Sequence, residues 1–167
     1  MSEIKFATIG TSRITKTFLS AASNVPGFKL EATYSRNIKN AIEFGTPYNV
    51  TKFYDSLKAL AEDRTIDAVY IASPNAFHCS QAIQMMKAGK HVLCEKSLAS
   101  NKKEAEEMFR TAAENNVILL EAMRPVFDPG MDAVKASLNK LGVIRRATLN
   151  YCQYSSRYDS FLQGHEH

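Results

Sequence analysis

The stretch that decides the fold is residues 4–15, which reads Ile4-Lys5-Phe6-Ala7-Thr8-Ile9-Gly10-Thr11-Ser12-Arg13-Ile14-Thr15. A short apolar run ends at Gly10, and a stretch with helical spacing of apolar residues follows. A strand, a small-residue turn and a helix make up the G-x-G-x-x-G fingerprint of dinucleotide-binding proteins, in which the backbone approaches a pyrophosphate closely. Ser12 and Thr15 take the second and third glycine positions. This motif alone leaves a phosphate-binding turn and an ordinary strand-to-helix turn equally open.

Apolar runs typical of strands alternate with helical stretches from this turn to about residue 122. Strands are expected at residues 4–9, 28–34, 68–72, 91–94 and 117–120. The run 68–72 is apolar throughout, which is typical of a strand covered on both faces of a parallel sheet. The alternation predicts an α/β fold class with a doubly wound parallel sheet, the arrangement of a Rossmann domain, over residues 1–122.

Capping residues and glycines mark the expected helix ends. Asn37, Asp55 and Asn101 are expected to cap helices, Asn101 together with Glu104 as a capping box. Gly45 and Gly89 are expected to end helices. The first helix is expected to bury one apolar face made of Ile14, Phe18 and Ala22.

Residues 123–167 follow a different pattern. Asp128-Pro129 is a good helix start, and residues 146–154 alternate in the manner of a half-buried antiparallel strand. One strand does not make a stable sheet. We therefore expect residues 123–167 to be the truncated, incomplete beginning (a helix plus a strand) of a second domain. The unpaired strand is expected to pair with another copy, so that a homo-oligomer is one expected state.

The composition excludes several classes of protein. Of the 167 residues, 45% are hydrophobic and 23% are charged, which argues against a disordered or collagen-like chain. The net charge of +4 comes from scattered Lys and Arg residues, so neither nucleic acid nor a membrane is expected as a partner. Three cysteines without a CxxC pair favour a reduced, cytoplasmic location, and no signal peptide or bilayer-spanning run is expected.

The end of the second expected strand bears on the choice of cofactor. NAD sites place an acidic residue there for the ribose diol, whereas an Arg accommodates the 2′-phosphate of NADP. This chain has Ser35-Arg36 and no carboxylate at that point. The pattern favours NADP, with NAD still open, and a solvated Arg at a helix start is the alternative interpretation.

Three later segments carry a resemblance to a known family. Residues 71–78 (Ile-Ala-Ser-Pro-Asn-Ala-Phe-His), residues 92–96 (Val-Leu-Cys-Glu-Lys) and residues 121–124 (Glu-Ala-Met-Arg) occur in this order after the first turn. They resemble the S/T-P-N-x-x-H and Glu-Lys-Pro signatures and the following segment of the Gfo/Idh/MocA family of NAD(P)-dependent oxidoreductases, over residues 4 to about 158. The resemblance implies hydride transfer between a nicotinamide and a hydroxyl-bearing carbon of a sugar, polyol or related small molecule. It also implies that residues 1–122 are the NAD(P)-binding Rossmann domain and that residues 123–167 begin a C-terminal α/β domain for substrate and oligomerisation.

The resemblance also implies roles for individual residues. The pyrophosphate would be held by Gly10, Thr11, Ser12, Arg13 and Ile14. Ser35 and Arg36 would face the adenosine ribose. The path to the nicotinamide ribose would be lined by Ser73, Pro74 and Asn75, with His78 beneath them and Glu95 nearby. Lys96 would lie beside the reacting carbon, and Met123 and Arg124 would border the cofactor.

Lys96 has a chemical rationale of its own. Oxidation of an alcohol removes the hydroxyl proton as hydride leaves carbon, and a nearby ammonium stabilises the developing negative charge. Its place after a parallel strand favours catalysis over a merely charged loop. His78 is equally open to binding and to a simple hydrogen-bonding role. No metal site is expected, including at His165 and His167 in the tail.

Two departures from the family pattern affect the expected activity. Ser97 replaces the proline that usually follows the lysine, and a cis bond before a non-proline residue costs about 3 kcal/mol. The peptide before Ser97 is therefore expected to be trans. The family's further acid–base pair has no match in this chain, so we expect cofactor binding with little or no turnover. A non-catalytic nucleotide-binding module or decayed fragment is the alternative.

Overall fold

The computed structural model describes residues 3–155 and 158–164, and the chain forms two compact units that divide after Arg124. The first unit contains one six-stranded sheet. Its strands are β1 (Ile4–Ile9), β2 (Phe28–Tyr34), β3 (Lys52–Tyr54), β4 (Ala68–Ile71), β5 (His91–Cys94) and β6 (Leu119–Glu121). The sheet order is β3-β2-β1-β4-β5-β6, and every neighbouring pair is parallel. The predicted doubly wound parallel sheet is confirmed.

The strand order reverses between β1 and β4, and this reversal positions the candidate site. In register, Ile9 at the end of β1 pairs with Tyr34 of β2 and with Ile71 of β4, and Ile71 pairs with Cys94 of β5. The carboxyl ends of these four strands therefore lie level at one edge of the sheet. Chains that leave a sheet in opposite directions at such a reversal leave room for a ligand between them.

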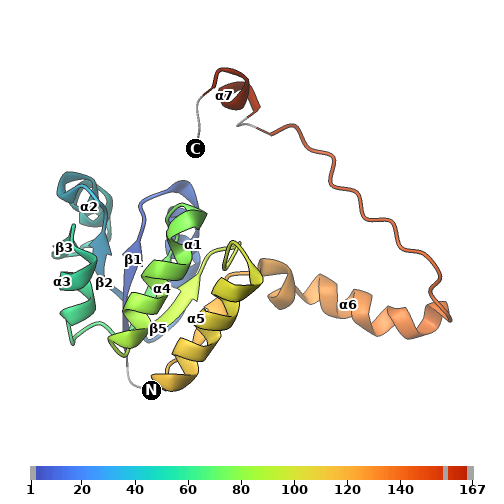
Figure 1. Cartoon of the computed structure of the whole chain (residues 1–167), viewed down its shortest axis with the longest axis horizontal. Coiled ribbons are helices and arrows are strands. Elements are labelled where there is room, and N and C mark those ends of the chain that lie inside the picture. The colour runs from blue at the N-terminus through green and yellow to red at the C-terminus, as the bar shows by residue number, and fades with distance from the viewer. Residues whose placement is uncertain (1–2, 156–157, 165–167) are drawn as a thin grey trace. The chain divides into compact units, whose positions relative to one another are not determined.

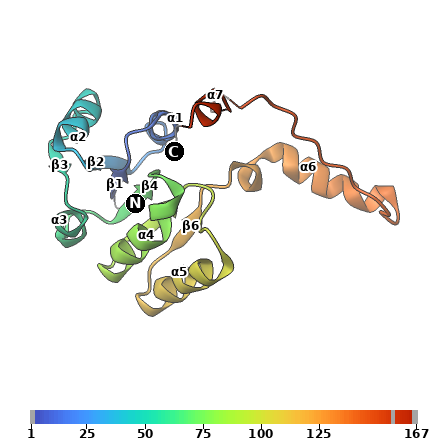
Figure 2. The same cartoon turned by 45° about the horizontal axis from the view of Figure 1, so that its top comes forward.

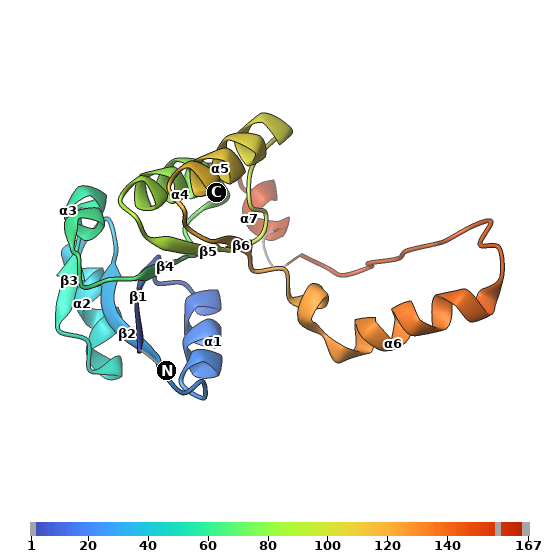
Figure 3. The same cartoon turned by 90° about the horizontal axis from the view of Figure 1, so that it is seen from below.

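Helices cover both faces of this sheet. They are α1 (Arg13–Ala22), α2 (Ile38–Gly45), α3 (Leu57–Glu62), α4 (His78–Lys87) and α5 (Lys102–Glu114), with short 3-10 turns η1 (Thr46–Tyr48) and η2 (Asn75–Phe77). Helices α4 and α5 pack side by side (Figure 1) on one face, and α1 lies on the other face (Figure 3). Helices α2 and α3 contact the edge strand β3 from its two sides (Figure 2).

The apolar core is divided into two clusters by the sheet. On the α4 and α5 face, Ala7 and Ile9 of β1 pack in one cluster with Met85 and Met108. On the α1 face, Phe6 packs in the other with Leu19. Strands with a core on both faces have no polar face, which explains why residues 69–71 are apolar and at most 1% exposed. The predicted covering of this strand on both faces is confirmed.

The caps confirm some expected helix boundaries. Asn37 Oδ1 accepts a 2.9 Å hydrogen bond from Lys39 N, and Asn101 Oδ1 accepts a 3.0 Å bond from Glu104 N. The Glu104 carboxylate accepts from Ser100 N, one residue before the position that a capping box uses. Gly89 follows α4 with a φ of 78°, as expected of a residue that ends a helix.

Two of the local expectations are wrong. Ser56, not Asp55, caps α3, because Ser56 immediately precedes the first helical residue and its Oγ accepts from the N–H of Ala59. Ile14 is 40% exposed, because the first turn of α1 buries Thr15 in its place. Gly45 is the last residue of α2, as expected, and the 3-10 turn η1 follows it directly.

The second unit begins within η3 (Arg124–Phe127) and contains α6 (Pro129–Leu138), η4 (Asn139–Leu141) and α7 (Tyr158–Leu162). Asp128 caps α6 by accepting a 2.8 Å hydrogen bond from Gly130 N, as predicted. The strand predicted at residues 146–154 is wrong: this segment forms no strand, and Leu149 is 96% exposed. The physical reason is the lack of a pairing strand for it in the described part of the chain. Within the described ranges, no helix is both long and apolar enough to cross a membrane.

Candidate functional site

A pocket of about 430 Å³ opens at the carboxyl ends of β1, β2 and β4, where the strand order reverses. The lining residues come from the last residues of these strands, from the loops that leave them, from the helical turns that follow and from the start of α3. They are Ile9, Gly10, Thr11, Ser12, Tyr34, Ser35, Arg36, Asn40, Leu57, Ala72, Ser73, Pro74, Phe77 and Gln81. Seven of the site residues predicted from the sequence are among them, namely Gly10, Thr11, Ser12, Ser35, Arg36, Ser73 and Pro74.

Gly10 brings the loops after β1 and β4 into direct contact. Its φ is 109°, which side chains with a Cβ rarely adopt, and a Cβ built on it would lie 2.6 Å from the carbonyl oxygen of Ala72. The N–H of Gly10 donates to Tyr34 O at 3.2 Å, and the N–H of Ala72 donates to Ile9 O at 2.8 Å. The turn is therefore fixed by both neighbouring strands, and only a residue without a Cβ fits.

The start of α1 gives the pocket a positive local potential. Ser12 is the N-cap residue of α1, yet its side chain accepts no hydrogen bond from the helix backbone, and the first turn carries no acidic residue. Ser12 Oγ instead lies 3.5 Å from Oγ1 of Thr15, which is completely buried. A helix N-terminus whose N–H groups are not satisfied by a side chain attracts anions such as phosphate.

The end of β2 contributes the pocket's charge. Among the described lining residues Arg36 alone is charged, and Ser35 lies beside it. The guanidinium carbon of Arg36 lies 5.8 Å from the centre of the Phe77 ring, within cation–π range. The pocket thus offers an anion a cation next to an aromatic face, and no carboxylate lines the pocket.

The first turn of α4 holds the loop after β4. Ser73 Oγ donates a 2.6 Å hydrogen bond to Oε1 of Gln81, a side chain that is buried and also lines the pocket. Phe77 and Gln81 lie four residues apart and therefore occupy one face of the helical turn. Sequence reasoning missed both residues, together with Asn40 and Tyr34. For Phe77 and Gln81 the available signal was this spacing around the predicted His78.

The structure places eight predicted site residues outside the pocket lining: Arg13, Ile14, Asn75, His78, Glu95, Lys96, Met123 and Arg124. His78 is completely buried, and its Nε2 and Nδ1 atoms each lie 2.9 Å from a carbonyl oxygen, those of Ser73 and Ser97 respectively. The expectation about His165 and His167 lies outside the described residues.

Glu95 and Lys96 follow β5 at the same edge of the sheet as the pocket. The N–H of Glu95 donates to Ile71 O at 2.8 Å, and Glu95 Oε1 accepts a 2.7 Å hydrogen bond from the hydroxyl of Tyr70. Burial, reinforced by this hydrogen bond, raises the pKa of Tyr70 far above its usual value, so Tyr70 acts as a donor that orients Glu95. Lys96 is exposed, and its ammonium group has no partner among the described residues.

The peptide bond between Lys96 and Ser97 is cis, and the expectation of a trans bond is therefore wrong. The intrinsic preference of a non-proline peptide bond is for trans, whereas the folded loop adds contacts that the local sequence does not show. Those contacts lie on the carbonyl of Ser97, which faces His78 Nδ1, and on the N–H of Leu98, which donates to Glu121 Oε1 at 2.9 Å.

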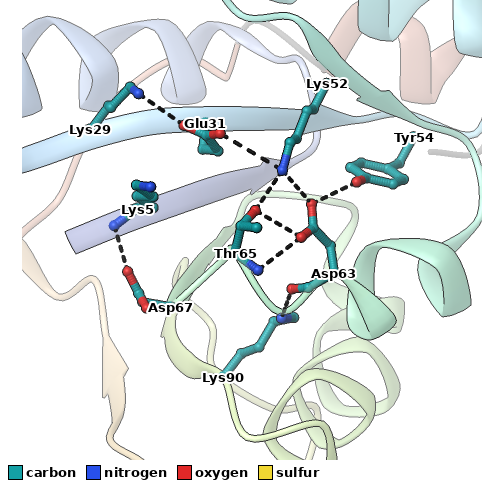
Figure 4. Close-up of polar contacts among 9 residues, drawn as sticks. All are labelled: Lys5, Lys29, Glu31, Lys52, Tyr54, Asp63, Thr65, Asp67 and Lys90. Carbon is teal, nitrogen blue, oxygen red and sulfur yellow. Dashed lines mark hydrogen bonds and ion pairs between the residues drawn. The ribbon is translucent and has the colours of Figure 1, made fainter. Parts of the chain in front are cut away.

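A polar cluster lies near the amino ends of β3, β4 and β5, whereas the pocket lies at the carboxyl ends of the strands (Figure 4). Asp63 receives hydrogen bonds from Thr65, from Lys52 Nζ at 3.0 Å and from the hydroxyl of Tyr54 at 2.8 Å. Burial alone would raise the pKa of Asp63, but these hydrogen bonds outweigh it and lower that pKa well below its usual range. Lys90, 2% exposed, donates to two carbonyl oxygens, those of Asp63 and Ile66. The side chains of Asp63, Lys52, Tyr54 and Lys90 are all hydrogen-bonded to one another or to the backbone, which indicates a structural role.

The strand order, the glycine turn and the position of the pocket define a Rossmann-type domain. The sequence also matches the profile of an oxidoreductase family with an NAD-binding Rossmann fold, GFO_IDH_MocA, over residues 4–123. The chain therefore belongs to the Gfo/Idh/MocA oxidoreductase family.

Individual relatives agree with this family. The chain is 50% identical over 161 residues to a scyllo-inositol 2-dehydrogenase (NADP(+)) of Bacillus subtilis, and 44% identical over 161 residues to an uncharacterized oxidoreductase of Escherichia coli. Each alignment covers 96% of this chain and 49% of the relative. A 3-ketoreductase from Actinomadura kijaniata, solved with TDP-benzene and NADP, superposes with a TM-score of 0.78 at 30% identity, covering 86% of this chain and 45% of that one. The chain thus spans about half the length of these relatives.

Proposed function

We propose that the chain binds NADP in the pocket at the carboxyl edge of the sheet, in preference to NAD. The observation that carries this proposal is Arg36, which with Ser35 lies at the end of β2 and is the charged residue of the described pocket lining. A ribose diol is bound by a carboxylate at this position, whereas a 2′-phosphate is accommodated by an Arg. The Bacillus subtilis relative uses NADP(+), and the Actinomadura enzyme was solved with NADP, which supports the same choice.

The proposed path of the cofactor follows the pocket. The pyrophosphate lies against Gly10, Thr11, Ser12, Arg13 and Ile14, where the unpaired N–H groups of α1 begin. Ser35 and Arg36 hold the adenosine ribose and its phosphate, and Ser73, Pro74 and Asn75 lead toward the nicotinamide. Glu95, Met123 and Arg124 border its far end.

For the whole protein we propose hydride transfer between this nicotinamide and a hydroxyl-bearing carbon of a sugar, polyol or related compound. The bound nicotinamide supplies the hydride chemistry. Lys96 is the proposed catalytic residue, because an ammonium stabilises the alkoxide that forms as the hydroxyl proton leaves. Its exposed ammonium, unpaired among the described residues, is available for that contact.

The second candidate is a nucleotide-binding module without catalysis. It is favoured by the position of Lys96, which is exposed and does not line the pocket. Turnover of polyols by this chain with NADP would exclude the second candidate. Binding of NADP with no turnover by a longer protein that contains this chain would exclude the first.

Calorimetric titration with NADP and with NAD tests the proposal. We expect NADP to bind at least tenfold more tightly than NAD, and Arg36→Ala to remove this difference, since a charge-assisted contact contributes about 1.5–3 kcal/mol. Arg110→Ala on the exposed face of α5 removes the same charge elsewhere and should leave both affinities unchanged. Equal binding of both nucleotides by the unmodified chain, or no binding, would contradict the proposal.

The remaining expectations stay predictions from the sequence. We propose that residues 1–122 are the NAD(P)-binding domain and that residues 123–167 belong to a domain for substrate and oligomerisation. A homo-oligomer and a cytoplasmic location are further predictions, which light scattering and cell fractionation would test.

A further inference from the structure

His78 joins two loops that come from different strands. It is the first residue of α4 and is completely buried. Its Nε2 lies 2.9 Å from the carbonyl oxygen of Ser73, in the loop after β4 that lines the pocket. Its Nδ1 lies 2.9 Å from the carbonyl oxygen of Ser97, in the loop after β5 that carries Lys96. One imidazole ring therefore contacts both a residue that lines the pocket and the residue that follows the proposed catalytic lysine.

Hydrogen bonds other than those of His78 also hold Ser73 and the residues on either side of Lys96. Ser73 is also held through its hydroxyl by Gln81. In the second loop, Glu95 N donates to Ile71 O and Leu98 N donates to Glu121, so that each side of Lys96 is tied to the sheet. The carbonyl of Ser97 lies between these two ties and is contacted by His78.

We propose that His78 is a positioning residue that fixes the Lys96 loop relative to the nucleotide-binding loop and does not itself touch the cofactor. This inference deepens the proposed function and rests on it for the roles of Ser73 and Lys96. A carbonyl oxygen can only accept, so each contact needs an N–H on the ring. A neutral imidazole carries one N–H and donates to only one of these carbonyls, so holding both Ser97 and Ser73 requires the imidazolium, with a hydrogen on Nδ1 and on Nε2.

Two isosteric substitutions separate the two contacts. Along the side chain, the amide nitrogen of Asn takes the position that Nδ1 has in histidine, and the amide nitrogen of Gln takes the position of Nε2. His78→Gln therefore keeps a donor for Ser73 and loses the one for Ser97. His78→Asn does the reverse.

The readouts are the calorimetric affinity for NADP and the hydrogen-exchange rate of the Leu98 amide. We expect His78→Gln to keep NADP affinity within about twofold and to speed exchange at Leu98 by about five- to tenfold, as for one lost hydrogen bond. His78→Asn should keep slow exchange at Leu98 and weaken NADP binding by about fivefold. A merely structural role would change both readouts together in both variants, and that result, or no change in either, would overturn the proposal.

A measurement on the unmodified chain covers the case in which a variant does not fold. The ¹⁵N spectrum of the His78 ring should show hydrogens on both Nδ1 and Nε2 that exchange slowly with water. A ring that lacks either hydrogen cannot hold both Ser97 and Ser73, which would overturn the proposal directly. If the unmodified chain binds no NADP, the proposed function fails, whereas the ring spectrum and Leu98 exchange still decide whether His78 holds the Lys96 loop.

Discussion

A Cβ atom added to Gly10 would lie 2.6 Å from the carbonyl oxygen of Ala72, closer than folded proteins allow. The two residues directly follow the neighbouring strands β1 and β4, at the point where the strand order reverses. This contact brings the backbone of the first turn to the floor of the pocket and makes Gly10 irreplaceable, even though Ser12 and Thr15 have replaced the other two glycines of the fingerprint.

Gly10→Ala should therefore destabilise the chain and abolish NADP binding, since the loop must move away from Ala72. We expect a loss of at least about 2 kcal/mol in the free energy of unfolding, measured by urea denaturation. Gly89→Ala is the matched control, because Gly89 also has a positive φ of 78° but no atom lies within 4 Å of an added Cβ. Equal losses in both variants would show that the contact with Ala72 has no effect.

Phe77 should contribute to the binding of both nucleotides. It lines the pocket beside Arg36 and is 41% exposed, so its ring is available for stacking with the adenine that NADP and NAD share. Base–aromatic stacking contributes about 1–3 kcal/mol, so Phe77→Ala should weaken NADP and NAD binding by about tenfold each in calorimetry. The control is Phe109→Ala, an exposed phenylalanine on α5. A loss confined to NADP would argue that the ring acts only through Arg36.

Asp63 should stabilise the fold without affecting the pocket. Asp63→Asn keeps the size of the side chain but removes the charge that Lys52 and Tyr54 contact, at a cost of about 2 kcal/mol in the free energy of unfolding. Glu62→Gln breaks an exposed ion pair with Lys58 and should cost less than about 0.5 kcal/mol. NADP affinity should be the same in both variants. A large change in affinity for Asp63→Asn would show that the two edges of the sheet are coupled.

The lowered pKa of Asp63 predicts that the folded chain loses stability at acid pH. The carboxyl group has a usual pKa of 3.8 and a much lower one in the folded chain. The folded state is therefore favoured while Asp63 is ionised, and this contribution is lost as the pH falls below about 4. Unfolding free energies measured between pH 3 and pH 7 should fall toward acid pH, less steeply for Asp63→Asn. Parallel curves for the two proteins would contradict this assignment.

The sequence predicted five of the six strands, because the central strands of the sheet are buried on both faces. The short edge strand β3 was missed, since all three of its residues are only half-buried. Runs such as residues 68–72 have no polar positions, and capping by Asn37, Asn101 and Asp128 depends on neighbours within three residues. The strand at residues 146–154 failed for the opposite reason. Its alternation is a local property, whereas strand formation requires a partner that the described chain does not supply.

The pocket was predicted in part because its loops carry family motifs. Gly10, Arg36 and Ser73 lie on loops that directly follow strands, where position in the sequence fixes position in the fold. Phe77 and Gln81 depend on how the first turn of α4 packs against the loop after β4. The contact between His78 and Ser97 joins two residues that are 19 apart in the sequence. A local sequence pattern does not show such a contact, and so neither the burial of His78 nor the cis bond before Ser97 was predicted.

The measurement that tests the central claim most directly is a ¹H–¹⁵N correlation spectrum of the chain during titration with NADP. The account predicts that the amides of Gly10, Thr11, Ser12, Ser35 and Ser73 shift together and saturate, while those of Thr65 and Asp67 at the opposite edge do not move. Saturating shifts confined to any other surface, or an unchanged spectrum at millimolar NADP, would contradict the claim that this pocket binds the dinucleotide.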